Sequence, residues 1–102
     1  MNEDKVKVHT EKEAENLLNS SRKKIDEIDQ EILELISKRT SFAKDIIISK
    51  KILHKNIHDE TREKKVYENI KKKSIEKNIN EDIIFQIMSL LMKLSKDAQE
   101  EE

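Results

Sequence analysis

Glycine and proline are both absent from the 102 residues of the chain. Without proline, no residue breaks a long helix by removing a backbone donor, and without glycine the tight turns of β-hairpins lose their preferred residue. Aromatic residues, which favour strands, make up only 3% of the sequence. The chain is therefore expected to be all-α.

The missing residue types also exclude several classes of function. A chain without glycine has no glycine-rich phosphate loop and no dinucleotide-binding fingerprint. Cysteine is absent as well, which excludes a disulfide framework, a thiolate metal site and a cysteine nucleophile. Lys and Arg total 21 against 22 Asp and Glu, so no net field favours nucleic acid or an acidic membrane.

No segment of the sequence approaches the roughly 20 consecutive apolar residues that a membrane span needs. The first ten residues also lack the apolar run of a secretion signal. We therefore expect a cytoplasmic protein with neither a membrane nor a nucleic-acid partner.

An apolar seam with alternating spacings of three and four residues predicts one long helix from Leu18 to Leu53. Such a helix would be about 54 Å long, more than a compact monomer of this size can cover, so its stripe requires a partner chain. Upstream, Thr10 and Glu13 have the spacing of a capping box. The seam consists of Leu18, Ser21, Ile25, Ile28, Ile32, Leu35, Arg39, Phe42, Ile46 and Ser49.

Cap residues predict two further helices. Asp59 can accept from the first amides of a helix running roughly from Glu60 to Lys77, and Asn80 can cap a third helix in the same way. The second helix is expected at the surface, and the third is expected to be the most buried. The apolar residues of the third helix include Ile83, Ile84, Ile87, Met88, Leu90, Leu91 and Leu94.

Polar residues stand where this pattern calls for apolar ones. Only three Arg accompany 18 Lys, and Arg39 interrupts the seam. An Arg in so Lys-rich a chain suggests a need for its planar, bidentate fork. Lys50, 11 residues further on, projects within about 20° of the same direction. The alternative is a buried interhelical ion pair for Arg39, with Lys50 extending to solvent at the helix end.

The stripe of the third helix continues into Ser95 and Gln99, and the second helix starts with Asp59, Arg62 and Glu63. Singly, these residues are explained as a frayed polar helix end and as an N-cap beside surface charges. Together they supply cationic donors, a carboxylate and neutral hydrogen bonders. This set suits a small dianion that carries carboxylates and a hydroxyl.

Polar motifs follow in a fixed order along the chain: Arg22-Lys-Lys-Ile-Asp-Glu-Ile-Asp29, Lys38-Arg39, Lys50, Asp59-x-x-Arg62-Glu63 and Ser95-x-x-x-Gln99. In these residues the chain resembles the all-helical chorismate mutases of the AroQ class. The eight polar positions of that family's active site are all filled with the expected residue type, without insertion or deletion. The resemblance implies a chorismate mutase domain over residues 18–102, preceded by a flexible N-terminal extension over residues 1–17.

The resemblance further implies an intertwined homodimer of three-helix chains that converts chorismate to prephenate in phenylalanine and tyrosine biosynthesis. It implies a stand-alone mutase without cofactor or metal. The reaction is a unimolecular pericyclic rearrangement, so it needs no nucleophile or general base. Catalysis would come from holding the compact reactive conformer and from stabilising charge on the breaking ether oxygen.

For the substrate carboxylates, the resemblance assigns Arg39 together with Arg22 of the partner subunit, with Ser95 assisting and Arg62 supporting the electrostatics. Arg22 and Arg39 lie 17 residues apart, about 260° around one helix, so they cannot readily face one site within a chain. A site shared between subunits resolves this.

For the rest of the substrate, the resemblance assigns Lys50 and Gln99 to the ether oxygen. Glu63, with the backbone near Asp59, would hold the ring hydroxyl. Some relatives carry Glu at the position of Gln99 and must protonate it to donate a hydrogen bond. Because Gln donates at any pH, we expect no acid-restricted activity from this position.

Two other functions compete with the mutase. Isochorismate-pyruvate lyase occurs on the same fold, but the complete set of eight positions favours the mutase. A non-catalytic coiled-coil module would explain the seam but not Arg39 within it. His54, His58 and Asp59 are weak metal candidates because Asn56 breaks the helix between them. Lys71–Lys73 is expected to be a solvated face rather than a phosphate site.

Overall fold

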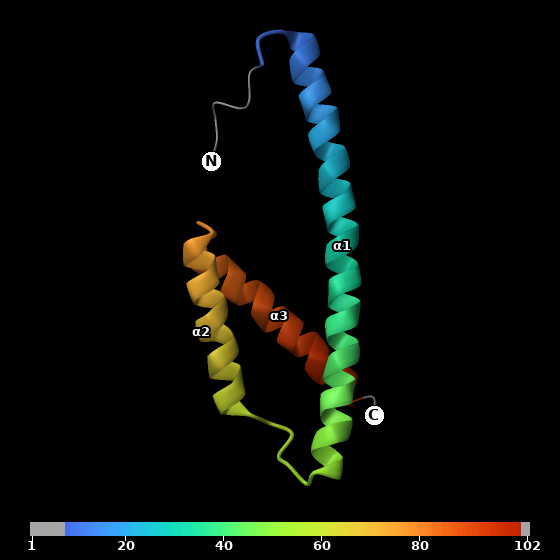
Figure 1. Ribbon diagram of the computed structural model, residues 1–102, viewed down its shortest axis with the longest axis vertical. Coiled ribbons are helices and arrows are strands. Elements are labelled where there is room, and N and C mark those ends of the chain that lie inside the picture. Colours follow the sequence, from blue (N-terminus) through green and yellow to red (C-terminus); the bar gives the residue numbers. More distant parts are fainter. Residues whose placement is uncertain (1–7, 101–102) are drawn as a thin grey trace. The chain divides into compact units, whose positions relative to one another are not determined.

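The computed structural model describes residues 8–100, with side chains as far as Asp97. Three helices make up its regular structure: α1 (Glu11–Ile52), α2 (Glu60–Glu76) and α3 (Glu81–Glu100) (Figure 1). The described residues contain no strand. The predicted all-α class and the number of helices are therefore confirmed. Residues 1–7 of the predicted flexible extension lie outside the described residues.

The start of α1 is fixed by the predicted capping residues. The Glu13 amide donates to Thr10 Oγ1 over 3.1 Å, and Glu13 Oε2 accepts from the His9 amide over 3.1 Å. The helix therefore begins at Glu11, and the predicted start at Leu18 is wrong. The apolar seam indicates where the helix needs a partner surface, whereas the cap and an uninterrupted run of helix-forming residues decide where it starts.

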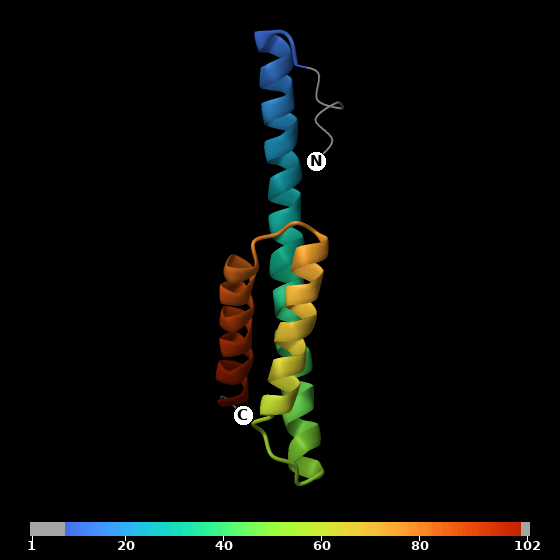
Figure 2. The same ribbon diagram turned by 90° about the vertical axis from the view of Figure 1, so that its left-hand side faces the viewer.

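The two shorter helices begin at the predicted caps. Asp59 Oδ1 accepts from the Arg62 amide, and Asn80 Oδ1 accepts from the Ile83 amide, both over 3.0 Å. Asn78, after α2, has a φ of 55°, in the left-handed region. This conformation turns the chain within a few residues, so that α2 and α3 run in opposite directions beside each other (Figure 2).

The chain divides into two compact units, Met1–Leu35 and Ile36–Glu102. In the second unit an aromatic contact joins α2 to α3: the rings of Tyr67 and Phe85 stack with centroids 4.5 Å apart. The Tyr67 hydroxyl also lies 3.0 Å from Ser89 Oγ, in hydrogen-bond distance. This pair satisfies the polar end of a part-buried tyrosine while its ring packs on the neighbouring helix.

The apolar core of the described chain is small. Within residues 8–97, only Ala43 and Ile47, both on α1, are buried hydrophobic residues. No described residue of α3 is fully buried, although a larger share of its described residues is half-buried than in α1 or α2, so the third helix is the most buried only in this sense. The physical reason is that one neighbouring helix cannot cover a stripe this broad, and Leu90 stays 64% exposed.

No helix within residues 8–100 combines the length and the apolar character that a membrane crossing requires.

Candidate functional site

A cavity of about 680 Å³ lies in the second unit, where α1, α2 and α3 each contribute to its wall. Its volume falls in the range typical of sites for small molecules. Apolar residues, among them Ile47 and Val66, form part of the wall. The cavity also collects six of the eight predicted site residues: Arg39, Lys50, Asp59, Arg62, Glu63 and Ser95.

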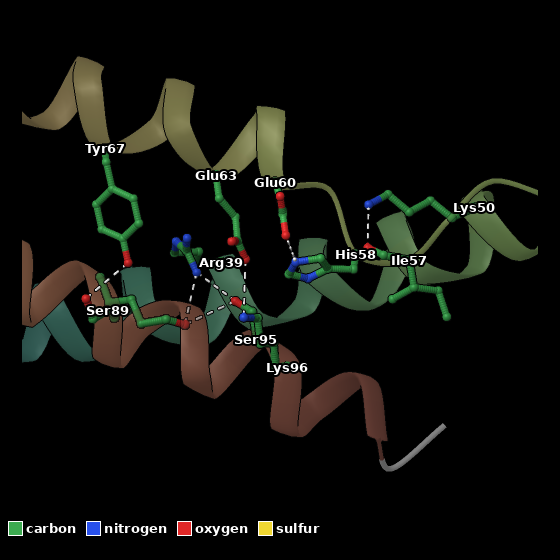
Figure 3. Close-up of polar contacts among 11 residues, drawn as sticks. Arg39, Lys50, Ile57, His58, Glu60, Glu63, Tyr67, Ser89, Ser95 and Lys96 are labelled. Carbon is green, nitrogen blue, oxygen red and sulfur yellow. Dashed lines mark hydrogen bonds and ion pairs between the residues drawn. The ribbon is translucent and has the colours of Figure 1, made fainter.

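Arg39 reaches from α1 to α3. Its Nη1 donates to Ser95 Oγ over 2.7 Å and to the Leu91 carbonyl over 3.2 Å (Figure 3). Among the described residues no carboxylate forms an ion pair with Arg39, so the buried interhelical ion pair considered from the sequence is not what the structure contains. A part-buried guanidinium bonded only to neutral acceptors keeps a positive charge available for a ligand.

Lys50 stands in the last turn of α1 and is partly buried. Its Nζ donates to the Ile57 carbonyl over 2.9 Å, which ties the ammonium to the connection between α1 and α2 (Figure 3). Arg39 and Lys50 line the same cavity, as their spacing on one helix face predicts.

The start of α2 contributes acidic groups. Asp59 is the N-cap, so its side chain serves the helix as the structural alternative predicts. Glu63, one turn later, forms an ion pair in which its Oε1 lies 3.2 Å from Lys96 Nζ (Figure 3). Sequence reasoning missed Lys96, although it directly follows Ser95, because one Lys among 18 carries no distinguishing signal.

The balance of charge around the cavity is positive. The basic residues Arg39, Lys50, Lys51, Arg62 and Lys96 line it against the acidic Asp59 and Glu63. Basic side chains next to an apolar wall can bind a small, partly apolar anion by charge-assisted hydrogen bonds. The arrangement offers binding and electrostatic stabilisation rather than a nucleophile.

A metal centre has no support in the described part of the chain, where no group of three or more His, Cys, Asp or Glu side chains could hold an ion. His58 instead pairs with Glu60, with Nε2 and Oε1 3.5 Å apart. His54 has a φ of 56° just after α1.

Of the two remaining predicted site residues, Arg22 does not join the set and Gln99 is not tested. Arg22 belongs to the first unit and is exposed. Gln99 lies near the end of α3, but its side chain is outside the described ones.

Comparisons with known proteins agree with the cavity's chemistry. The family described as chorismate mutase type II matches residues 21–100. The chain is also 44% identical, over 80 residues, to a protein named chorismate mutase from Methanocaldococcus jannaschii; the match covers 78% of this chain and 81% of that protein. No solved structure matches the chain. The match to the family extends over all three helices, and the chain belongs to the type II chorismate mutase family.

Proposed function

We propose that the protein is a chorismate mutase that rearranges chorismate to prephenate in the cavity around Arg39. The observation that carries the proposal is the guanidinium of Arg39, which is part-buried, bonded to neutral acceptors and set in a wall rich in basic groups. Chorismate carries two carboxylates, so it would balance the excess of positive charge in this wall. Family membership gives the reaction.

In the proposed mechanism, Arg39 binds one substrate carboxylate in a bidentate manner, and Ser95 holds the guanidinium in place from α3. Arg62, at the start of α2, adds positive charge to the same cavity. Fixing the carboxylates selects the compact conformer in which the two carbons that form the new bond approach each other. This converts binding energy into a favourable entropy of activation.

Lys50 would act on the ether oxygen, where negative charge develops as the carbon–oxygen bond breaks. Its ammonium has three N–H donors, so one can bond the Ile57 carbonyl while another donates to the substrate. Gln99 is proposed as the second donor to that oxygen. Donors that meet charge present only in the transition state lower the barrier without tightening substrate binding equally.

Glu63, with the backbone at Asp59, is proposed to accept a hydrogen bond from the ring hydroxyl. Both residues belong to the first turn of α2 or its cap, and both line the cavity. The Glu63 carboxylate would attract the neutral ring hydroxyl and repel the two substrate carboxylates. It would thereby favour one orientation of the substrate, with its carboxylates at the basic residues.

We further propose an intertwined homodimer in which Arg22 of the partner subunit completes each site. Uncovered apolar side chains support it in both units, for example Ile25 at 55% and Phe42 at 66% exposure. Monomeric soluble proteins rarely expose a continuous apolar stripe of this kind. A second copy of the same seam is the natural cover for it.

The test is loss of the ultraviolet absorbance of chorismate on addition of the purified protein, with isochorismate in a parallel sample. We expect saturable conversion of chorismate to prephenate. Conversion of isochorismate alone would instead indicate the lyase, and a folded helical protein that leaves both substrates intact would indicate a non-catalytic module.

A further inference from the structure

Among the described Lys and Arg side chains of the cavity wall, Lys96 is the one that forms an ion pair with a carboxylate. Its Nζ lies 3.2 Å from Glu63 Oε1, and the pair joins α3 to α2 (Figure 3). Glu63 is the less accessible partner, with a side chain 32% exposed against 54% for Lys96. Both residues of the pair line the cavity.

The two oxygens of Glu63 have different surroundings. Oε1 pairs with Lys96, whereas Oε2 accepts no hydrogen bond within the described residues. An ionised carboxylate can accept at both oxygens. One oxygen of Glu63 is thus held, and the other remains able to accept from a ligand hydroxyl.

Glu63 also shares the cavity with Arg39 and Arg62, to which a carboxylate could bind in a bidentate manner. Such a pair would neutralise the guanidinium on which anion binding depends. A cation that holds Glu63 on the α3 side prevents this competition. Arg39 is indeed without an ion-pair partner among the described residues while Glu63 pairs with Lys96.

We propose that Lys96 is a positioning residue that holds Glu63 so that its free oxygen accepts from the substrate's ring hydroxyl and Arg39 stays available. This inference rests on the proposed chorismate mutase function. The hydroxyl is not part of the breaking or forming bonds, so its hydrogen bond contributes equally to substrate and transition-state binding. Its loss therefore raises KM and leaves kcat almost unchanged.

The first experiment measures kcat and KM for chorismate in the full-length wild type, Lys96→Met, Lys96→Arg and Lys93→Met. The control Lys93 is an exposed Lys on the same helix that does not line the cavity. We expect Lys96→Met to raise KM about two- to fivefold, the range for a partly exposed ion pair. Lys96→Arg should restore KM, and Lys93→Met should match the wild type.

A second experiment repeats Lys96→Met in a Glu63→Gln background. If Lys96 acts through Glu63, its loss adds no further rise in KM there. A rise of the same size in both backgrounds would show that Lys96 binds the anion directly, and would overturn the proposed role.

The possible outcomes distinguish a failure of the proposed role of Lys96 from a failure of the proposed chorismate mutase activity. A wild type that converts chorismate, with an unchanged KM or a lowered kcat in Lys96→Met, would overturn the role of Lys96 alone. A folded wild type without mutase activity would overturn the proposed function and this role with it.

Discussion

Arg39 shows how a charged residue can occupy an apolar seam without a carboxylate to neutralise it. Its guanidinium donates to a hydroxyl and a backbone carbonyl on α3. These neutral acceptors occupy part of its hydrogen-bonding capacity but do not neutralise its positive charge. A bound dianion would complete the arrangement. The sequence revealed this residue because Arg is rare here and breaks a periodic pattern.

Lys50 is the residue whose removal should affect the chemical step most directly. If it donates to the ether oxygen, Lys50→Ala removes a charge-assisted bond that is strongest in the transition state. We expect kcat to fall about 10²–10³-fold, which is the range for the loss of one preorganised donor. Steady-state kinetics measure this, and an unchanged far-ultraviolet circular dichroism spectrum would confirm that helicity is retained. Turnover near the wild-type rate would contradict the assignment of Lys50.

Gln99 offers a second test at the same scale. A carboxylate accepts hydrogen bonds but cannot donate them unless protonated. The variant Gln99→Glu should therefore lose activity as the pH rises through the pKa of the new carboxyl, ordinarily about 4.3. The wild type should show no such loss in its pH–rate profile. Identical profiles for the two proteins would remove Gln99 from the ether-oxygen site.

At the scale of the helices, short-range rules predicted most of what the structure contains. The caps at Asp59 and Asn80 lie where side-chain chemistry placed them, because an N-cap depends on neighbours within one turn. The start of α1 at Glu11 was not predicted, because the apolar seam predicts a start at its own first residue, Leu18. The Glu63–Lys96 pair was missed because it joins two helices, and no local pattern encodes which Lys of many meets a carboxylate.

Asn78 provides a stability prediction for the turn between α2 and α3. Its φ of 55° lies in the left-handed region, which Gly and Asn tolerate better than other residues. The side chain is exposed, so substitutions there change backbone preference rather than packing. We expect Asn78→Ala to lower the free energy of unfolding by about 1 kcal/mol, and Asn78→Gly to leave it nearly unchanged.

Urea unfolding at one fixed protein concentration measures both variants, because the stability of an oligomer depends on concentration. Equal stability of Asn78→Ala and Asn78→Gly would show that the turn does not depend on the left-handed conformation.

At the scale of the whole molecule, the proposed site requires a partner chain. Each described unit leaves large apolar side chains uncovered, and Arg22 lies in a different unit from the cavity. The sequence predicted the need for a partner from the length of the seam alone. How two copies join is not encoded in any short motif, because it depends on surfaces contributed by residues far apart in the chain.

A shared site can be tested by mixing two inactive variants. Arg22→Ala and Arg39→Ala are each expected to lose most activity as homodimers. If Arg22 acts across the interface, a heterodimer of the two has one intact site and one that lacks both residues. Unfolding and refolding an equimolar mixture should restore about a quarter of the wild-type activity, since half of the dimers are then mixed. A mixture as inactive as its components would place both residues in one subunit's site.

The cavity around Arg39 is proposed to rearrange chorismate to prephenate. A kinetic comparison of the wild type with Arg39→Ala tests this proposal, with chorismate as the substrate and prephenate identified as the product. We predict saturable prephenate formation by the wild type and a loss of kcat/KM of at least about 10²-fold, or about 3 kcal/mol, in a variant of unchanged helicity. A wild type that forms no prephenate, or an Arg39→Ala variant as active as the wild type, would contradict the claim.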